Sequence, residues 1–276
     1  MSAETPTIQT WSNSSLTLLE RCGEKFRRRY IEKERVPPSP RMLRGTVIHR
    51  VAKMAMLRKL EEQEIPSGEE ARDVAATEFE QEWAGGVSLD HGTDANVEKA
   101  GSKDFAVDLS AFYVGAVAPT VEPIAVERRI EVAPKDSDLK ITGVIDLVAK
   151  LPSGGEAIRD TKTSEKSPNR DAAENSQQLT MYAMVRQADV GKLPEALALD
   201  HLVRTPARRE QKHIVQETTR DAGDVAALVN RLNTAVEAVK RGVFMPTAPD
   251  SWWCSRNWCE YWSSCVYVRR GERAKS

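Results

Sequence analysis

Asp160 and Lys162 have the types and the spacing to act together on a phosphate. They belong to Asp160-Thr161-Lys162, in a stretch that alternates as a β-strand does, so both side chains project from one face. Asp146 lies on the preceding predicted strand. A three-residue loop at 152–154 would pair Asp146 with Asp160 and hold their Cβ atoms roughly 4.5–5.5 Å apart. That register is an assumption, and a slip of one residue would separate the pair.

Two carboxylates at that separation repel each other, and a strand pair gains no stability from them. A divalent cation between them would remove the repulsion, and oxygen ligands suit Mg²⁺ or Mn²⁺. Lys162 could then hold a phosphate oxygen or an attacking water. The alternative is a surface hairpin with scattered charges, because D-x-K alone is a weak signal.

Three further residues favour the metal site. His49 lies on a predicted helix before the strands, and imidazole ligates metals well, although a lone helical histidine is usually structural. Gln178 and Tyr182 are four residues apart on a predicted helix after the strands, so they share one face. Both could reach the hairpin; the alternatives are an exposed glutamine and an ordinary core tyrosine.

The elements that must position these residues follow from hydrophobic periodicity. The pattern predicts helices over 11–30, 43–64, 68–84, 104–118, 172–187 and 221–241, a loop over 85–103, and strands over 124–132, 139–150, 156–163, 196–204 and near 212–217. Three successive strands can form an antiparallel meander, and the helix after them can lead to a parallel fourth strand. The predicted class is α/β, with a mixed sheet flanked by helices.

The four cysteines fall in two places. Cys22 lies in the first predicted helix, and Cys254, Cys259 and Cys265 are spaced C-x4-C-x5-C near the end of the chain. Four thiolates would suit Zn²⁺ or an iron–sulfur cluster, but the one-plus-three split lacks the second paired knuckle of structural zinc sites. The alternative is four unrelated thiols. Four of the six tryptophans lie in the same tail: Trp252, Trp253, Trp258 and Trp262. We expect most of them to shield a cluster from water, with stacking on the bases of a single strand as the alternative.

The net charge of −1 hides a strong asymmetry. Residues 20–60 carry 13 Lys and Arg against 4 Asp and Glu, a balance of +9. Residues 61–108 carry 3 basic against 14 acidic residues, a balance of −11. The basic block could meet a polyanion; the alternative is two solvated helix faces of opposite sign.

Taken in chain order, these residues resemble the PD-(D/E)xK nuclease superfamily, and within it the RecB-like branch. The resemblance covers about residues 12–204 plus the cysteine tail. The proline of the superfamily's name is missing before Asp146, as is common in this branch. The motifs that carry the resemblance are His49 in R-G-x-x-x-H, Asp146 in Gly143-Val144-Ile145-Asp146, Asp160-Thr161-Lys162, and Gln178 to Tyr182 as Q-x-x-x-Y.

The resemblance implies a restriction-endonuclease-like core with the order α-β-β-β-α-β. One nuclease domain, 1–276, would comprise an N-terminal cluster helix at 11–35, the core at 43–204 with a helical insert at 61–118, a helix at 221–241 and a cysteine- and tryptophan-rich tail at 243–276.

The resemblance also implies roles for single residues. His49, Asp146, Asp160 and the Thr161 carbonyl would bind metal, with Lys162 as the catalytic lysine. Gln178 and Tyr182 would support the site or the DNA backbone. The chain is also similar to AddB-type nucleases, the nucleases of CRISPR adaptation modules and phage RecB-family exonucleases. In such relatives a one-plus-three set of cysteines holds a [4Fe-4S] cluster; here that set is Cys22, Cys254, Cys259 and Cys265, with a first tail gap of four residues rather than the more frequent two.

The predicted function is a metal-dependent DNA nuclease, an exonuclease on single strands or ends, serving recombination, repair or phage DNA processing. The basic block would follow the DNA backbone, with Arg27, Arg28, Arg29 and Arg44 as the chosen contacts. One alternative is a non-catalytic DNA-binding or complex-assembly module; another is a zinc-stabilised protein with no nucleic acid role. A helicase or recombination partner would be a separate chain, because G-x-x-x-x-G-K-[ST] is missing. With neither a secretory signal nor an apolar run near 18 residues, we expect a cytoplasmic protein without a membrane partner.

Overall fold

The computed structural model describes residues 8, 10–90, 92–133, 139–205 and 210–268. The chain divides into two compact units. The first unit comprises 1–37, 132–142 and 226–276, and the second comprises 38–131 and 143–225. Residues 269–276 of the predicted tail lie outside the described residues.

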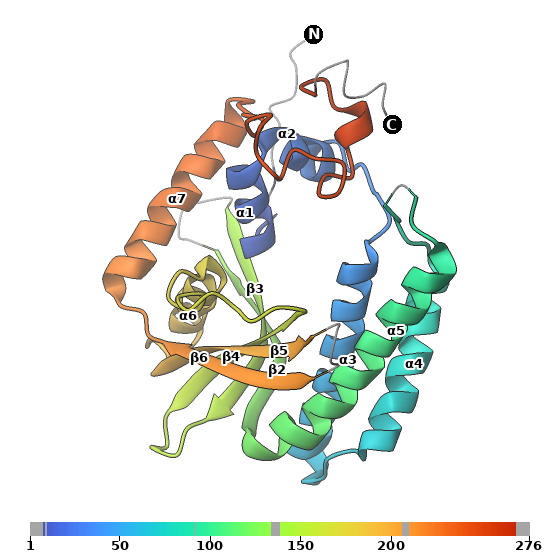
Figure 1. Ribbon diagram of the computed structural model, residues 1–276. Coiled ribbons are helices and arrows are strands. Elements are labelled where there is room, and N and C mark those ends of the chain that lie inside the picture. Colours follow the sequence, from blue (N-terminus) through green and yellow to red (C-terminus); the bar gives the residue numbers. More distant parts are fainter. Residues whose placement is uncertain (1–7, 9, 91, 134–138, 206–209, 269–276) are drawn as a thin grey trace. The chain divides into compact units, whose positions relative to one another are not determined.

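The second unit contains a mixed sheet with helices on its faces (Figure 1). The strands are β2 (Glu122–Val132), β3 (Lys140–Lys150), β4 (Glu156–Ser164), β5 (Ala196–Arg204) and β6 (Gln211–Thr218). The helices are α3 (Pro40–Glu62), α4 (Gly68–Ala84), α5 (Ala95–Phe112) and α6 (Gln177–Val190), and a π-helical turn (Tyr113–Val117) and a 3-10 turn (Ala118–Thr120) follow α5.

The topology confirms the predicted fold class. The strand order is β1-β3-β4-β5-β6, with β1 the short segment Thr10–Trp11, and β2 also pairs with β3. The β3–β4 pair is antiparallel, β4–β5 is parallel and β5–β6 is antiparallel. Helix α6 lies between β4 and β5 in the chain, so it makes the predicted crossover.

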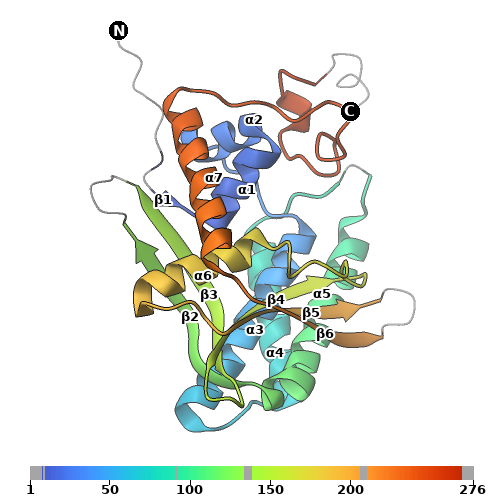
Figure 2. The ribbon, with the colours of Figure 1, turned by 90° about the vertical axis from the view of Figure 1, so that its left-hand side faces the viewer.

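Strand alternation gives the sheet two different faces. Leu147, Ala149 and Leu202 belong to one buried apolar cluster with residues of α3, α4 and α5. Neighbouring residues point the other way, and there Asp160 meets Gln178 on α6. Figure 2 shows α6 on one side of the strands and α3 to α5 on the other. The packed helices therefore support one face and leave the second for α6 and polar side chains.

Two helix starts differ from the predictions. Helix α5 begins at Ala95 rather than 104, inside the predicted loop, because the Asp94 side chain caps it by accepting from the amides of Asn96 and Val97. Helix α6 begins at Gln177 rather than 172, where the Ser176 side chain accepts from the Leu179 amide. In both cases a local cap, rather than apolar periodicity, sets the boundary.

The predicted helix over 11–30 is also interrupted. Cys22 is extended, at φ −160° and ψ 105°, and separates α1 (Asn13–Arg21) from α2 (Gly23–Phe26). A π-helical turn, Arg27–Ile31, follows. The other elements assigned to the first unit are α7 (Ala222–Lys240), which begins in the second unit, and a 3-10 turn in the tail (Trp262–Ser264).

The break at Cys22 has a tertiary cause. The amide of Gly23 donates to the carbonyl of Met245 at 2.7 Å, so the tail lies directly against the start of α2. A Cβ atom at Gly23 would come within 2.6 Å of the Phe244 and Met245 backbone. Glycine is needed here because it has no Cβ. Phe26 then stacks between Trp11 and Phe244 to form the core of this unit.

Among the described residues, none of the helices combines the length and the apolar character needed to cross a membrane.

Candidate functional site

The hairpin of β3 and β4 has the register that the sequence predicts. Leu151 donates to the carbonyl of Gly155 at 2.8 Å, which closes the three-residue loop. The ladder runs from Lys150 opposite Glu156 to Leu147 opposite Arg159. One step further along the same register brings position 146 opposite position 160. The register assumed for the hairpin is therefore confirmed over 147–150 and 156–159, and the facing of Asp146 and Asp160 stays a prediction that extends it by one residue.

Asp146 and the β4 backbone are in direct contact. The amide of Thr161 donates to Asp146 Oδ2 at 3.2 Å. His49, on α3, places Nδ1 3.2 Å from the same oxygen. Burial lowers the pKa of His49, but the hydrogen bond and charge of Asp146 outweigh it, and the net pKa lies above its ordinary value. Thus the predicted residues from three separate elements meet at one carboxylate.

Asp160 is the centre of a second set of contacts. Its side chain is 1% exposed, and its Oδ2 lies 2.6 Å from Lys162 Nζ. Gln178 joins the two, because its Nε2 donates to Asp160 Oδ1 at 2.8 Å and its Oε1 accepts from Lys162 Nζ at 2.7 Å. The predicted glutamine thus holds both the carboxylate and the ammonium in place.

Tyr182 completes this arrangement from one turn further along α6. Its hydroxyl accepts from Gln178 at 2.6 Å and lies 3.4 Å from Asp160 Oδ1. Gly143 on β3 makes room for it: a Cβ there would lie 3.1 Å from Val185 and 3.5 Å from the Tyr182 ring. A larger residue at 143 would therefore push α6, and with it the Gln178 side chain, away from the sheet.

The electrostatics of Asp160 are those of a buried carboxylate beside a second carboxylate and one lysine. Burial raises its pKa above the ordinary value, and the Asp146 charge adds to this, against the opposing charges of Lys162 and His49. Although Oδ2 is paired with Lys162, it is buried and accepts no hydrogen bond from any described residue. A buried acceptor in that state favours a cation.

One positioning residue has no signature in the sequence. Arg220 is buried and donates to the Thr180 hydroxyl on α6 at 2.7 Å. It also donates to the carbonyls of Ala173, Glu174 and Ser176, at 2.9, 2.9 and 3.2 Å. A guanidinium with five donors in a rigid fork suits such a convergence of acceptors. Arg220 therefore fixes the turn that leads into α6, on which Gln178 lies.

A second buried network lies on the opposite face of the sheet. Asp200 on β5 accepts from Arg159 at 2.8 and 2.5 Å and lies 2.7 Å from His213 Nε2. Burial tends to raise the pKa of Asp200, but these partners outweigh it and the pKa lies below its ordinary value. The paired carboxylate therefore stays charged, which is typical of a structural ion pair rather than of a proton donor.

The arginines predicted to contact DNA are placed differently from one another. Arg27 is paired with Glu24 and Glu32, and Arg28 with Glu34. Arg44 is paired with Glu165 at 2.5 Å and lies over the Phe105 ring. Arg29 is exposed, and no carboxylate of the described chain lies within ion-pair distance of it. Of the four, Arg29 is thus the one whose charge is not already balanced.

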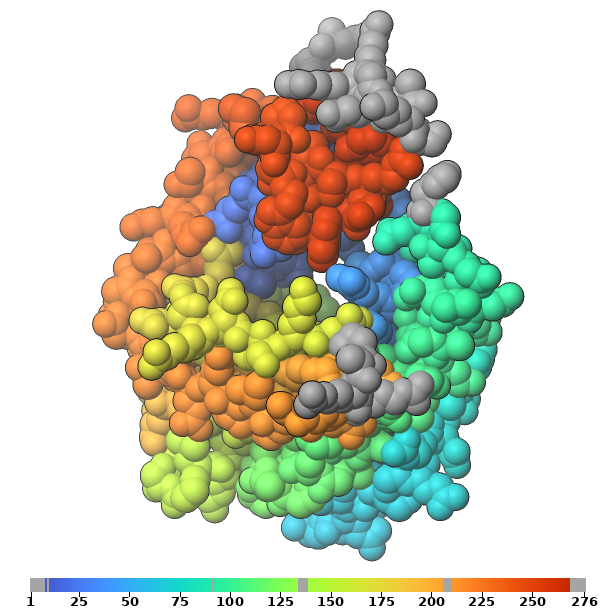
Figure 3. Space-filling model, viewed as in Figure 1, coloured from blue at the N-terminus to red at the C-terminus, as the bar shows by residue number. Residues whose placement is uncertain are grey.

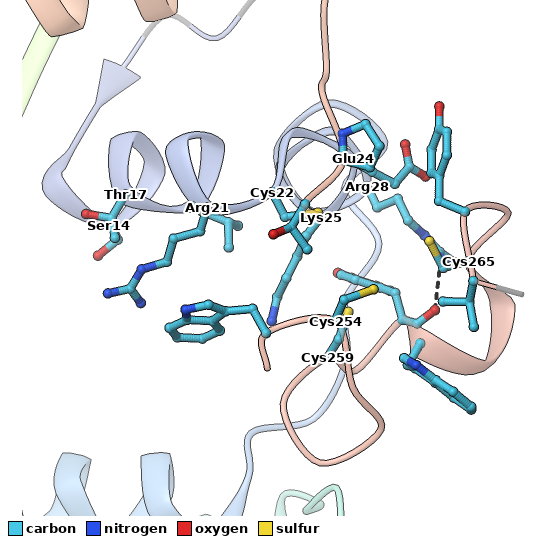
Figure 4. A pocket seen from close by; sticks show the side chains of 18 of the residues that line it. Ser14, Thr17, Arg21, Cys22, Glu24, Lys25, Arg28, Cys254, Cys259 and Cys265 are labelled. Carbon is cyan, nitrogen blue, oxygen red and sulfur yellow. Dashed lines mark hydrogen bonds between the residues drawn. The ribbon is translucent and has the colours of Figure 1, made fainter. Parts of the chain in front are cut away.

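The first unit has a cavity of about 350 Å³, and all four cysteines line it (Figure 4). Cys22 comes from the helix break, and Cys254, Cys259 and Cys265 come from the tail. Arg21 lies toward the other end of the cavity with Ser14 and Thr17. Burial raises the pKa of Cys259 to about 11, so this thiol stays protonated at neutral pH until a metal displaces the proton.

Within the described part of the chain, no group of three or more histidine, cysteine, aspartate or glutamate side chains is already arranged as a metal site. At the sheet, Lys162 lies against the Asp160 oxygen that a cation would use. In the first unit, the cysteines share a cavity but are not drawn together as ligands are.

Comparison with known proteins identifies a family. The model of the PD-(D/E)XK nuclease superfamily matches residues 10–266. No curated protein matches the chain. A solved structure described as "Crystal structure of SSO0001" is 16% identical, covering 98% of this chain and 89% of its own, with a TM-score of 0.45. That likeness is too low to support an argument about fold or function.

Proposed function

The chain belongs to the PD-(D/E)XK nuclease superfamily, and from that premise we propose that it is a metal-dependent deoxyribonuclease of the RecB-like branch. We propose further that it acts as an exonuclease on single-stranded DNA or on DNA ends. Recombination, repair or phage DNA processing would be its setting, in the cytoplasm, with any helicase or recombination protein as a separate chain.

The observation that carries this proposal is the convergence of predicted residues on one sheet face. Asp146, Asp160 and Lys162 come from adjacent strands in the expected register, and Gln178 ties the last two together. An inactive relative would be expected to have lost one of the two carboxylates or the lysine. None of the three is replaced, which favours an enzyme over a non-catalytic DNA-binding or assembly module.

The donor set fits a divalent cation such as Mg²⁺ or Mn²⁺. Asp160 presents a buried Oδ2 that accepts no hydrogen bond from the described residues, and Asp146 presents its carboxylate from the neighbouring strand. His49 places Nδ1 3.2 Å from Asp146 Oδ2, so this is the ring nitrogen on the side of the carboxylates that could join the same cation. We propose that these three side chains and the Thr161 carbonyl hold the cation. When bound, it would lower the pKa of a water and stabilise charge on the phosphate.

The chain's own residues have separate tasks in this proposal. Gln178 and Tyr182 hold Asp160 Oδ1, so the other oxygen, Oδ2, faces Lys162. Lys162 is 40% exposed at its side chain, so its ammonium can meet a phosphate oxygen or the attacking water while Gln178 steadies it. Fixed charges of this kind act on the charge that develops in the transition state.

The nuclease proposal is tested on end-labelled single- and double-stranded DNA with Mg²⁺ and with Mn²⁺. The wild-type chain should shorten the labelled strands, whereas D160N and K162A should not. E69Q, an exposed carboxylate on α4, is the matched control and should cut as the wild type does. DNA binding without cleavage by the wild type in either metal would refute the enzyme and favour the binding module.

We also propose that the four cysteines hold a [4Fe-4S] cluster, with a four-thiolate zinc site as the alternative. The support is that Cys22, Cys254, Cys259 and Cys265 line one cavity, although 231 residues separate the first two. Protein prepared without oxygen should carry about four iron and four sulfide per chain. Stoichiometric zinc without sulfide would refute the iron–sulfur cluster but keep a four-thiolate metal site that joins Cys22 to the tail. Full stability of both C22A and C259A would refute that metal site as well.

A further inference from the structure

The tail tryptophans of the first unit divide into two groups. Trp253 and Trp262 line the cysteine cavity, as shielding groups should. Trp252 and Trp258 are not among the described residues that line it. They are instead 57% and 43% exposed. Shielding of the cavity therefore does not account for this second pair, and neighbouring exposed rings of this size are typical of a binding surface.

The exposed rings belong to an ordered stack. The Trp252 and Trp253 rings stack with centroids 4.2 Å apart, and the Trp258 ring meets Trp252 edge-on at 4.9 Å. The Arg21 guanidinium lies 4.2 Å from the centroid of the Trp253 ring. A guanidinium and two indoles in succession make the same kind of layered surface on which a nucleobase stacks.

Backbone and side-chain contacts hold the rings in place. Lys25 on α2 donates to the Trp258 carbonyl at 3.3 Å and is paired with Glu260 at 2.5 Å. The Ser255 hydroxyl donates to the Trp252 carbonyl at 2.8 Å. Figure 3 shows the tail as one continuous surface of packed side chains. A ligand would therefore meet rings that are already ordered, which lowers the entropy lost on binding.

The charge beside the stack is complementary to a phosphate chain. Glu20, the neighbouring carboxylate, is engaged by Arg231 at 2.9 Å. Arg21 has no carboxylate within ion-pair distance among the residues that the structure describes. An exposed cation next to aromatic faces is the combination that binds single-stranded nucleic acid, because phosphates need charge and unpaired bases need ring faces. An apolar protein surface would gain nothing from Arg21.

We propose that Trp252, Trp258 and Arg21 form a binding platform for single-stranded DNA, with a base on the exposed indoles and a phosphate at the guanidinium. The proposal rests on the proposed nuclease function and names the form of its substrate. The platform belongs to the first unit, whereas the carboxylates and Lys162 belong to the second. It thus accounts for binding and takes no part in cleavage.

Binding is measured by fluorescence anisotropy of a labelled oligothymidylate, with D160N as the parent chain so that no cleavage occurs. W252A and W258A should each raise the Kd about 5- to 150-fold, the loss expected for one base stack. W252F should keep most of the affinity, whereas W252L should not, because leucine keeps apolar area but no ring. R21Q should reduce the slope of log K against log salt by about 0.7.

Two controls keep the test specific. M245A removes an exposed apolar side chain of the same tail that takes no part in the stack, and it should not change the Kd. Duplex DNA should bind equally well to W252A and its parent. Equal affinities of W252L and W252F, or of W252A and its parent, would overturn the platform, and the first result would favour an apolar protein-docking patch. If the wild-type chain cuts single strands but W252A loses no affinity, the platform alone is refuted. If the wild-type chain neither binds nor cuts them, the proposed function is refuted as well.

Discussion

Substituting alanine at Gly23 tests the contact that breaks the N-terminal helix. The new Cβ would lie 2.6 Å from the Met245 amide nitrogen, whereas ordinary contact begins at 3.4 Å, so the tail must move by about 0.8 Å (3.4 minus 2.6). The neighbouring atoms are backbone, so no side chain can rotate away. Overpacking of this kind costs about 1–3 kcal/mol.

Two further effects enter the change in free energy of unfolding. The 2.7 Å hydrogen bond from Gly23 to Met245 cannot survive the displacement, and its loss costs about 0.5–1.5 kcal/mol. Alanine also restricts the unfolded chain more than glycine does, and this effect stabilises the folded state by about 0.4–1 kcal/mol. The net destabilisation of G23A is therefore about 0.5–4 kcal/mol. The same displacement moves the tail cysteines relative to Cys22, so cluster content should fall as well.

The measurement is denaturant unfolding followed by tryptophan fluorescence. Five of the six tryptophans belong to the first unit, all but Trp83, so the signal reports this unit. The matched control is G101A in the middle of α5, where a Cβ would meet nothing within 4 Å. That change lies in the second unit, so it should leave the midpoint of the first-unit signal unchanged, although it should stabilise α5 itself by about 0.5–1 kcal/mol, since glycine is a poor helix former. An unchanged midpoint for G23A would refute the close approach of the tail to α2.

Three further predictions concern the second unit. D160N and K162A should each lower cleavage at least about 100-fold, because both act on developing charge. D160N should keep an unfolding midpoint near that of the wild type, and a midpoint that falls with its activity would instead indicate misfolding. D200N should cost about 3–5 kcal/mol at pH 7, since it leaves the half-buried guanidinium of Arg159 without its carboxylate. Because the Asp200 pKa is lowered by folding, this contribution is present above about pH 4 and is lost as the pH falls further, so wild type and D200N should converge in acid unfolding. R220Q should lower the rate of cleavage and disorder the start of α6, detectable as faster amide exchange near Gln178; unchanged exchange there would refute the positioning role.

The features that could be predicted from the sequence are those set by local geometry. The three-residue loop between β3 and β4 sets the register of the hairpin, so the pairing of 147–150 with 156–159 followed from the sequence alone. The spacing of Gln178 and Tyr182 fixes their common helix face in the same way. In each case one short segment determines the result.

The features that could not be predicted depend on segments far apart in the chain. The helix predicted over 11–30 ends at Cys22 because Met245 and Phe244 lie against Gly23. Arg220 fixes the turn before α6 from a position more than forty residues later, and nothing in its own neighbourhood distinguishes it from a surface arginine. Apolar periodicity records which face a segment buries, but not which distant backbone it meets.

The opposite charges of the two early blocks are largely balanced within the protein. Arg50 on α3 pairs with Glu78 and Glu82 on α4, and Arg58 pairs with Glu70. Within the part of the chain that the structure describes, at least seven of the thirteen cations of residues 20–60 hold a carboxylate: Lys25, Arg27, Arg28, Arg44, Arg50, Lys53 and Arg58.

A cation that keeps its carboxylate releases no counterion when DNA binds. Fewer than thirteen cations of the block can then release counterions, so this block gives a slope of log K against log salt for single strands that is shallower than the −9 or so expected from thirteen. The rest of the affinity must come from other sources. The ordered rings of Trp252 and Trp253, beside Arg21, supply binding by stacking, which salt does not screen. For this reason, single-strand recognition would depend on the tail rather than on the basic block.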